Sequence, residues 1–185
     1  MAQAVVDAGC TSVLLVSYAT DGAGIIEELS GLGFSGAIYG ADGIAEEGLA
    51  TGMSDTTLVD GIIATKPSAA GTPGAVAVVF AALCAASTDC AGGIYTAEAF
   101  DAVTIAAFAA FTALATPGLA AEAAVAGTGQ GWNGASGTIS FLANGDVPAA
   151  GFCIGEFSTA TDGTVSYDCA RSWDPVNGIT TATTE

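Results

Sequence analysis

Residues 12–49, SVLLVSYATDGAGIIEELSGLGFSGAIYGADGIAEEGL, constrain the fold more than any other part of the chain. The run SVLLVS is short, continuous and apolar, which is typical of a parallel strand buried on both faces. The apolar spacing that follows predicts a helix over residues 23–31, capped at its start by Thr20 or Asp21. A second strand is expected at residues 36–39. This order predicts an α/β fold with a parallel sheet.

Two polar side chains follow these strands directly: Tyr18 comes after the first strand and Asp42 after the second. The carboxyl ends of neighbouring parallel strands meet at one edge of an open sheet, where ligands usually bind. Each residue also has a purely structural interpretation. Asp-Gly is a common turn dipeptide, and a tyrosine at a strand end often packs against the core. We expect both residues to contact a ligand.

The order of a strand ending in Tyr, a helix ending in LGF and a strand leading into G-x-D-G resembles type I periplasmic binding proteins. It is most similar to the branch that serves branched-chain amino acid ABC transporters. Later segments extend the resemblance, namely the Lys66-Pro67 pair, the helix AFDAVTIAAFAAF and the run GTISFLANGDVPAAGFCIGEF. Phe100 stands where the family has Tyr in that helix. Family members are about twice as long, so the chain resembles their C-terminal half.

The resemblance implies a domain organisation of parallel-sheet, Rossmann-like lobes in truncated form. Residues 1–65 would form part of lobe 2, and residues 66–129 would return into lobe 1. Residues 130–185 would supply the terminal strands of lobe 2 and a frayed tail. The crossings between the lobes would lie at Lys66-Pro67 and within residues 127–134, so that the lobes could close by a hinge motion.

The resemblance also implies a function. The protein would be an extracytoplasmic solute-binding protein of an ABC importer, located in the periplasm or outside the cell. It would hold a branched-chain or related amino acid, or a small amide, between two lobes and deliver it to membrane transporter subunits. Asp42 would bind the α-ammonium group and Tyr18 would contact the same ligand, without a cofactor. Two alternatives stay open: a ligand-sensing domain of the same fold, and a small α/β enzyme that uses Asp42 as an acid or base.

Charge and composition exclude several other function classes. The chain has 19 acidic and 2 basic residues, a net charge of −17. Nucleic-acid binding and attraction to anionic membrane surfaces both need clusters of Lys and Arg. Two basic residues cannot form such clusters, so both functions are excluded. The sequence contains no His, which removes Ser-His-Asp and Cys-His catalysis and the commonest transition-metal ligand. It also lacks a CxxC pair, so we expect neither a metal site nor an enzyme.

Two segments bear on membrane location. The apolar stretch at residues 102–115 is short and rich in Ala, and we interpret it as a buried helix rather than a membrane span. Met1 is followed by AQAVVDAGC, without the basic start and apolar run of a secretory signal. We therefore expect no direct membrane insertion and a missing signal segment.

The five cysteines form two plausible disulfide pairs and one remainder. Cys84 and Cys90 lie six residues apart at a helix end, whereas Cys153 and Cys169 lie in two strand-like runs joined by a turn. Proteins outside the cytoplasm carry such disulfides. The alternative is that all five are small buried thiols in a reducing compartment. Cys10 is expected to be a buried thiol in either case.

Residues 129–134, GQGWNG, formally match a dinucleotide-binding glycine pattern. That pattern needs a strand before it and a helix after it. Here an Ala-rich helix comes first and a strand follows, so the match carries no function. We expect a loop that includes Trp132.

The net charge of −17 generates a testable prediction. Repulsion among like charges opposes the compact state, and dissolved salt screens it over a few ångströms at molar concentration. The melting temperature should therefore rise between low and molar sodium chloride, as measured by circular dichroism. A melting temperature that does not change would contradict this account.

Overall fold

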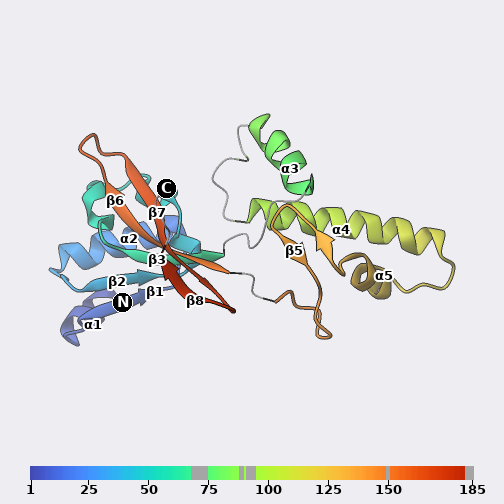
Figure 1. The fold of residues 1–185 in the computed structure, drawn as a ribbon. Helices are drawn as coiled ribbons and strands as arrows, with labels where there is room; N and C mark the ends of the chain where they lie inside the picture. The colour runs from blue at the N-terminus through green and yellow to red at the C-terminus, as the bar shows by residue number, and fades with distance from the viewer. Residues whose placement is uncertain (68–74, 88–89, 91–94, 149–150, 182–185) are drawn as a thin grey trace. The chain divides into compact units, whose positions relative to one another are not determined.

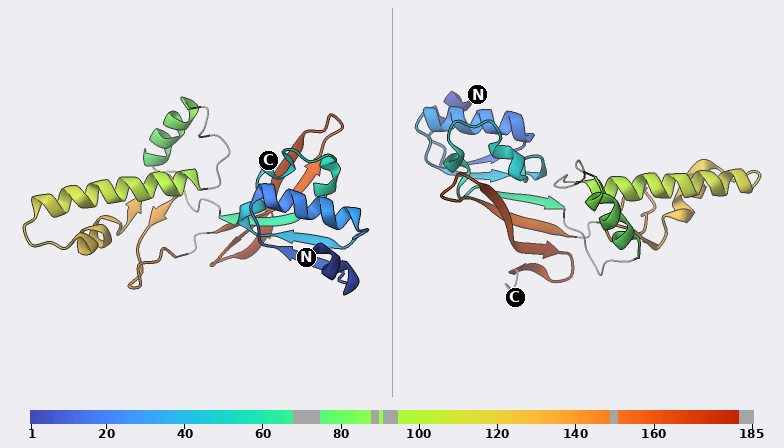
Figure 2. Two further views of the ribbon diagram at one scale, coloured as in Figure 1. Left: turned by 180° about the vertical axis from the view of Figure 1, so that it is seen from behind. Right: turned by 90° about the horizontal axis from the view of Figure 1, so that it is seen from above.

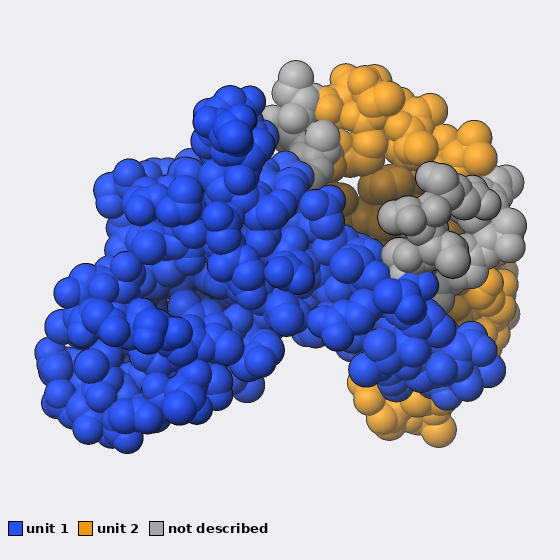
Figure 3. All heavy atoms as spheres, turned by 60° about the vertical axis from the view of Figure 1, so that its left-hand side comes forward, with its two compact units in different colours: residues 1–67, 152–185 blue, residues 68–151 orange. Residues whose placement is uncertain are grey.

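The computed structural model contains two compact units, which are described separately below (Figures 1 and 3). Unit 1 comprises Met1–Pro67 and Phe152–Glu185, and unit 2 comprises Ser68–Gly151. The second boundary differs from our expectation, because residues 130–151 belong to unit 2 and not with the terminal strands. The structure describes residues 1–67, 75–87, 90, 95–148 and 151–181.

Unit 1 is built on a six-stranded sheet with the order β1-β2-β3-β6-β7-β8 (Figure 1). The first three strands are parallel, as expected, and the later strands are antiparallel. This arrangement confirms the α/β fold class. The strands are β1 (Ser12–Leu15), β2 (Ala37–Gly40), β3 (Ile63–Pro67), β6 (Phe152–Thr159), β7 (Val165–Asp174) and β8 (Gly178–Thr181). The helices are α1 (Ala2–Asp7), α2 (Ala19–Gly31) and three 3₁₀ turns, η1 (Asp42–Ile44), η2 (Glu47–Ala50) and η3 (Thr56–Val59).

The core of unit 1 lies on one face of the sheet, where α2 and the 3₁₀ turns cover the strands. The opposite face of β1 and β2 is open: the side chain of Leu14 is 71% exposed and that of Tyr39 is 45% exposed. The prediction that SVLLVS is buried on both faces was therefore wrong, because no described segment packs on that second face. The buried side chains are those of Leu15, Ile26, Ile44, Ala45, Leu49, Ala50, Val59, Ile62, Ala64, Cys153, Phe157 and Tyr167.

Helix α2 starts earlier than the sequence suggested. Tyr18 is its N-cap residue, and neither Thr20 nor Asp21 caps it. Both residues lie inside the first turn instead. The Asp21 carboxylate there interacts favourably with the positive end of the helix dipole.

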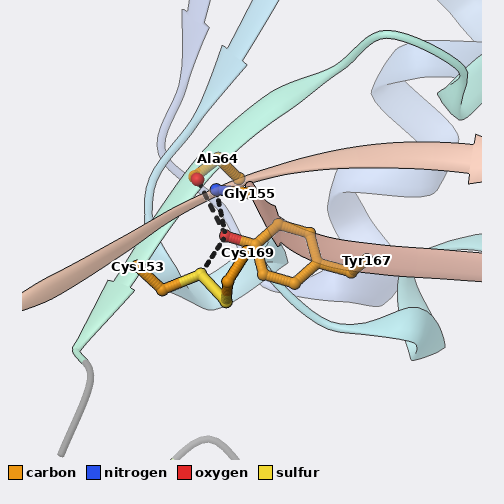
Figure 4. The surroundings of a disulfide bond; sticks show 5 residues. All are labelled: Ala64, Cys153, Gly155, Tyr167 and Cys169. Atoms are coloured by element: carbon orange, nitrogen blue, oxygen red, sulfur yellow. Dashed lines mark hydrogen bonds between the residues drawn. A yellow bond between two sulfur atoms is a disulfide. The ribbon is translucent and has the colours of Figure 1, made fainter. Parts of the chain in front are cut away.

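The hydroxyl of Tyr167 ties three strands together next to a disulfide (Figure 4). It donates a hydrogen bond of 2.8 Å to the carbonyl oxygen of Ala64 in β3 and accepts one of 3.2 Å from the N–H of Gly155 in β6. Cys153 and Cys169 join β6 to β7 at a β-bulge, with their Cα atoms 5.4 Å apart. The β3–β6–β7 pairing is thus held by side chains as well as by its backbone ladder.

The structure contains both disulfides that the spacing of the cysteines suggested. The second, between Cys84 and Cys90, lies in unit 2 with a Cα separation of 5.0 Å. Cys10 is a free thiol in the turn between α1 and β1, and it is exposed. The expectation that Cys10 is buried was wrong, because Cys10 lies in a turn whose residues are all exposed to solvent.

Unit 2 consists of three helices and a small hairpin: α3 (Ala75–Ala85), α4 (Thr96–Ala115), α5 (Ala121–Thr128), β4 (Trp132–Asn133) and β5 (Thr138–Ile139). Asp101 of α4 is fully buried and accepts hydrogen bonds from the N–H groups of Ala135 and Ser136, each 2.8 Å long. Its carboxylate also accepts a bond from the Ser136 hydroxyl at 2.7 Å. These bonds fix the turn of the hairpin against α4. The GQGWNG segment was expected to be a loop, but two of its residues, Trp132 and Asn133, form strand β4.

Helix α4 is more exposed than expected. Only 17% of the residues in its most apolar 18-residue stretch are buried. The interpretation of residues 102–115 as a buried helix was therefore wrong. The side chains of Phe111 and Leu114 are 77% and 86% exposed. The helix has the length and hydropathy of a membrane span, with 20 residues and a mean hydropathy of 1.5. Its buried Asp101, however, binds the hairpin turn of the same unit.

We predict that replacing Tyr167 by Phe destabilises unit 1 and changes its response to alkaline pH. The substitution removes two buried hydrogen bonds, one to the carbonyl oxygen of Ala64 and one from the N–H of Gly155, which costs about 1–3 kcal/mol of unfolding free energy at neutral pH. Burial raises the pKa of Tyr167 above its ordinary value of 10.0. The protonated phenol therefore stabilises the fold fully below pH 10.0, and this contribution is lost as the pH rises through the folded-state pKa.

Urea unfolding at neutral and alkaline pH measures both effects, and an ultraviolet titration of tyrosinate follows the ionisation itself. Tyr39→Phe is the matched control, because the Tyr39 ring is 45% exposed. Equal unfolding free energies for the two variants would contradict the role assigned to the Tyr167 hydroxyl.

Candidate functional site

The structure places Tyr18 and Asp42 on the same open pocket, at the carboxyl ends of β1 and β2. The pocket has a volume of about 400 Å³. It is lined by Val16, Ser17, Tyr18, Asp21, Ala41, Asp42 and Gly43. The two residues that the sequence analysis singled out are therefore neighbours in space, at the position where open α/β sheets bind ligands.

Tyr18 reaches this position because β1 ends just before it and α2 begins just after it. Its carbonyl oxygen accepts a 2.8 Å hydrogen bond from the N–H of Gly22, which closes the first turn of α2. Its side chain is 79% exposed. The ring is thus available to a ligand. The purely structural interpretation, in which the ring packs against the core, does not apply to Tyr18.

Asp42 is positioned by the residues on either side of it. The N–H of Ala41 donates a 3.1 Å hydrogen bond to the carbonyl oxygen of Leu15, which continues the β1–β2 pairing up to the pocket. Ile44, two residues later, is fully buried. Asp42 begins the η1 turn between these two anchors and is half-buried.

Small residues allow this close packing. An added Cβ at Gly43 would overlap the carbonyl oxygen of Ser17, so the turn that carries Asp42 lies directly against the end of β1. An added Cβ at Gly22 would lie 2.9 Å from Cγ2 of Ile44. Larger residues at these positions would push the η1 turn away from Tyr18 and change the shape of the pocket.

Asp21 is a third member of the pocket that the sequence analysis did not assign to the site. It follows Tyr18 by three residues, a separation that places side chains on the same side of a helix. From the sequence, Asp21 was expected to act only as a helix cap. Since α2 includes Tyr18 as its N-cap, the carboxylate lies one turn into the helix and lines the pocket.

The pocket attracts cations. Asp21 and Asp42 both line it, and none of its lining residues is Lys or Arg. A ligand group with a positive charge is attracted to two nearby carboxylates, whereas a free carboxylate is repelled. Among the described residues, no group of three or more His, Cys, Asp or Glu side chains could hold a metal ion. Two carboxylates beside the apolar side chain of Val16 and the ring of Tyr18 can accommodate a group that has a positive charge and an apolar part.

Comparison with known proteins gives a clear result for structure only. No protein-family model matches the sequence, and no curated protein matches it significantly. Solved structures do match. The leucine-binding protein LivK from Thermotoga maritima MSB8 has a TM-score of 0.69 at 20% sequence identity, over 94% of this chain and 47% of that one.

Two further matches agree with the first. The branched-chain amino acid substrate-binding protein LivJ from Streptococcus pneumoniae, in complex with isoleucine, has a TM-score of 0.61 at 18% identity, over 90% of this chain and 47% of that one. A solute-binding protein of an ABC transporter from Rhodopseudomonas palustris BisB5, in complex with 3,4-dihydroxybenzoic acid, has a TM-score of 0.62 at 18% identity. The match covers 96% of this chain and 48% of that one. The chain thus spans about half the length of these structures. Over that half, it has the fold of the substrate-binding proteins of ABC transporters.

Proposed function

We propose that this chain is part of an extracytoplasmic solute-binding protein of an ABC importer and that it binds a small ligand with an ammonium group. A branched-chain or related amino acid has the required ammonium group. A small amide, the other ligand that the resemblance implies, is uncharged and would be held by hydrogen bonds alone. The pairing of Tyr18 and Asp42 on one pocket carries the proposal. The fold shared with ABC-transporter substrate-binding proteins supports it.

In this proposal, the Asp42 carboxylate binds the ligand's ammonium group and the Asp21 carboxylate adds to the attraction. A charge-assisted hydrogen bond of this kind contributes about 1.5–3 kcal/mol. The Tyr18 ring covers the apolar part of the ligand, and its hydroxyl can accept or donate a further bond. The chain needs no reaction chemistry for this role, and it would act without catalysis.

The pocket in unit 1 would form one wall of the binding site. The second wall, with donors for the ligand's carboxylate, would come from the other lobe of the complete fold. Closure of the two lobes would hold the ligand until it reaches the membrane subunits of the transporter. The two disulfides agree with a location outside the cytoplasm.

A series of three related ligands tests the proposed site in the 185-residue chain. Leucinamide carries a positive charge, leucine is a zwitterion, and 4-methylpentanoate is an anion with the same apolar group. We expect affinity to fall in that order, since two carboxylates line the pocket and no basic residue does. Chemical-shift changes at the amides of Tyr18 and Asp42 measure the binding by NMR titration. Equal or stronger binding of 4-methylpentanoate would overturn the proposal.

We predict that Asp42→Asn weakens leucinamide binding at least about tenfold, because the substitution removes the charge but keeps the shape of the side chain. Asp60→Asn is the matched control. Asp60 lines a different pocket, next to the amino end of β2, and its loss should leave leucinamide affinity unchanged. If Asp42→Asn has no larger effect than the control, Asp42 does not belong to the binding site.

A further inference from the structure

The two halves of the Cys153–Cys169 disulfide have different surroundings. The side chain of Cys153 is 3% exposed and belongs to the core of unit 1, whereas Cys169 is exposed to solvent. Exchange with an external thiol begins when a thiolate attacks one of the two sulfur atoms, so that atom must be accessible. The attacked atom is therefore Sγ of Cys169, and Cys153 supplies the sulfur that leaves.

A positive charge lies on the side of the sulfur that leaves. Lys66 pairs directly with Cys153 in the antiparallel β3–β6 ladder, so both side chains project from the same face of the sheet. The Lys66 ammonium lies 4.8 Å from the centre of the Tyr167 ring. The hydroxyl oxygen of that tyrosine lies 3.6 Å from Sγ of Cys153 (Figure 4). One of the two basic side chains in the chain is thus placed beside this disulfide.

The nearest acidic residues of β6 and β7 belong to the other face of the sheet. Glu156 and Asp168 pair with each other and are both exposed. Successive side chains of a strand alternate between the two faces, so Asp168 lies opposite to its neighbours Tyr167 and Cys169. A thiolate formed at Cys153 therefore shares its face with the lysine and not with these carboxylates.

This charge decides whether Cys153 can leave as an anion. Burial in apolar surroundings disfavours a thiolate, whereas a nearby cation stabilises it. A thiolate that is better stabilised also leaves faster in thiol–disulfide exchange. The pairing of Cys153 with Lys66 thus offsets the burial of the sulfur.

We propose that the Cys153–Cys169 disulfide is an exchange site for a dithiol reductant. A thiolate of the reductant attacks Sγ of Cys169, the disulfide bond breaks, and Cys153 leaves as a thiolate. The second thiolate of the reductant then attacks the mixed disulfide and releases Cys169. The two cysteines gain two electrons and take up two protons, while the reductant becomes a disulfide. The site does not use Tyr18 or Asp42, so it stands independently of the proposed ligand.

Reduction at this position acts on the strands that connect unit 1 to unit 2. Pro67, the last residue of β3, pairs with Phe152, the first residue of β6, and the residues between them form unit 2. In both views of Figure 2, β3 (green) ends beside the start of β6 (orange). Breaking the disulfide removes the covalent tie between the start of β6 and its neighbour β7.

Other contacts keep the reduced sheet folded. The Tyr167 hydroxyl still bonds to Ala64 and Gly155, and the ring of Phe152 still contacts that of Trp173, with centroids 5.9 Å apart. Reduction therefore loosens the start of β6 without unfolding unit 1.

Mapping of the mixed disulfide tests which sulfur is attacked. The parent protein carries Cys10→Ser, which removes the free thiol. Native protein is treated briefly with the monothiol cysteamine, new thiols are blocked with N-ethylmaleimide, and both groups are located by mass spectrometry. We expect cysteamine on Cys169 and N-ethylmaleimide on Cys153. Cysteamine on Cys153 would overturn the proposal, as would a disulfide that opens only after urea has unfolded the chain.

Lysine variants test the role of the charge. Lys66→Met keeps the apolar stem but removes the ammonium group, so dithiothreitol should reduce Cys153–Cys169 at least about tenfold more slowly. Lys66→Arg keeps the charge and should retain most of the rate. The Cys84–Cys90 disulfide of the same molecule is the internal control and should be reduced at an unchanged rate.

The direction of the effect separates this role from a structural one. A substitution that only destabilised the sheet would expose the disulfide and speed up its reduction. An equal or faster reduction of Cys153–Cys169 in Lys66→Met would therefore overturn the proposal.

Hydrogen exchange with mass spectrometry measures the structural consequence. Amides of residues 152–154 should exchange at least about fivefold faster after reduction, because local opening becomes easier there. Amides of β1 (Ser12–Leu15) should exchange equally in the oxidised and reduced protein. Equal exchange at residues 152–154 would contradict the loosening of β6.

Discussion

The buried contact of Ile44 with the α2–β2 layer is the constraint on which the site depends. Ile44 is fully buried, and it fits because Gly22 and Gly40 have no side chains where its own side chain packs. This contact fixes the η1 turn, and the turn fixes Asp42 against the end of β1. The hydrophobic core therefore helps to hold the turn that carries Asp42 next to Tyr18.

Local patterns in the sequence were sufficient for the features that depend on neighbouring residues. The continuous apolar run, the helix that follows it and the Asp-Gly turn predicted parallel strands with Tyr18 and Asp42 at their ends. Both disulfides followed from spacing, because a helix end and a hairpin each bring nearby cysteines together. In each case, the partner lies within a short stretch of chain.

Features that depend on distant partners could not be predicted. The apolar residues of β1 and α4 suggested burial, yet Leu14 and Phe111 are exposed, since burial requires a covering segment that the described residues do not supply. Asp21 was not predicted as a site residue, because acidic residues are common at the start of a helix, where they interact favourably with the helix dipole. Cys10 was expected to be buried for a related reason: a cysteine beside an apolar strand suggests burial, yet no described segment covers the turn that contains it.

Lysine 66 has a consequence for the surroundings of the whole protein. Its ammonium group lies 4.8 Å from the centre of the Tyr167 ring, so one of the two basic side chains of the chain is committed to a cation–π contact within the sheet. The charged groups that remain on the surface are then almost all acidic, and a diffuse layer of mobile cations must accompany them in solution. Amines share that layer with sodium and potassium, so a positively charged solute is enriched around the molecule before it meets any pocket.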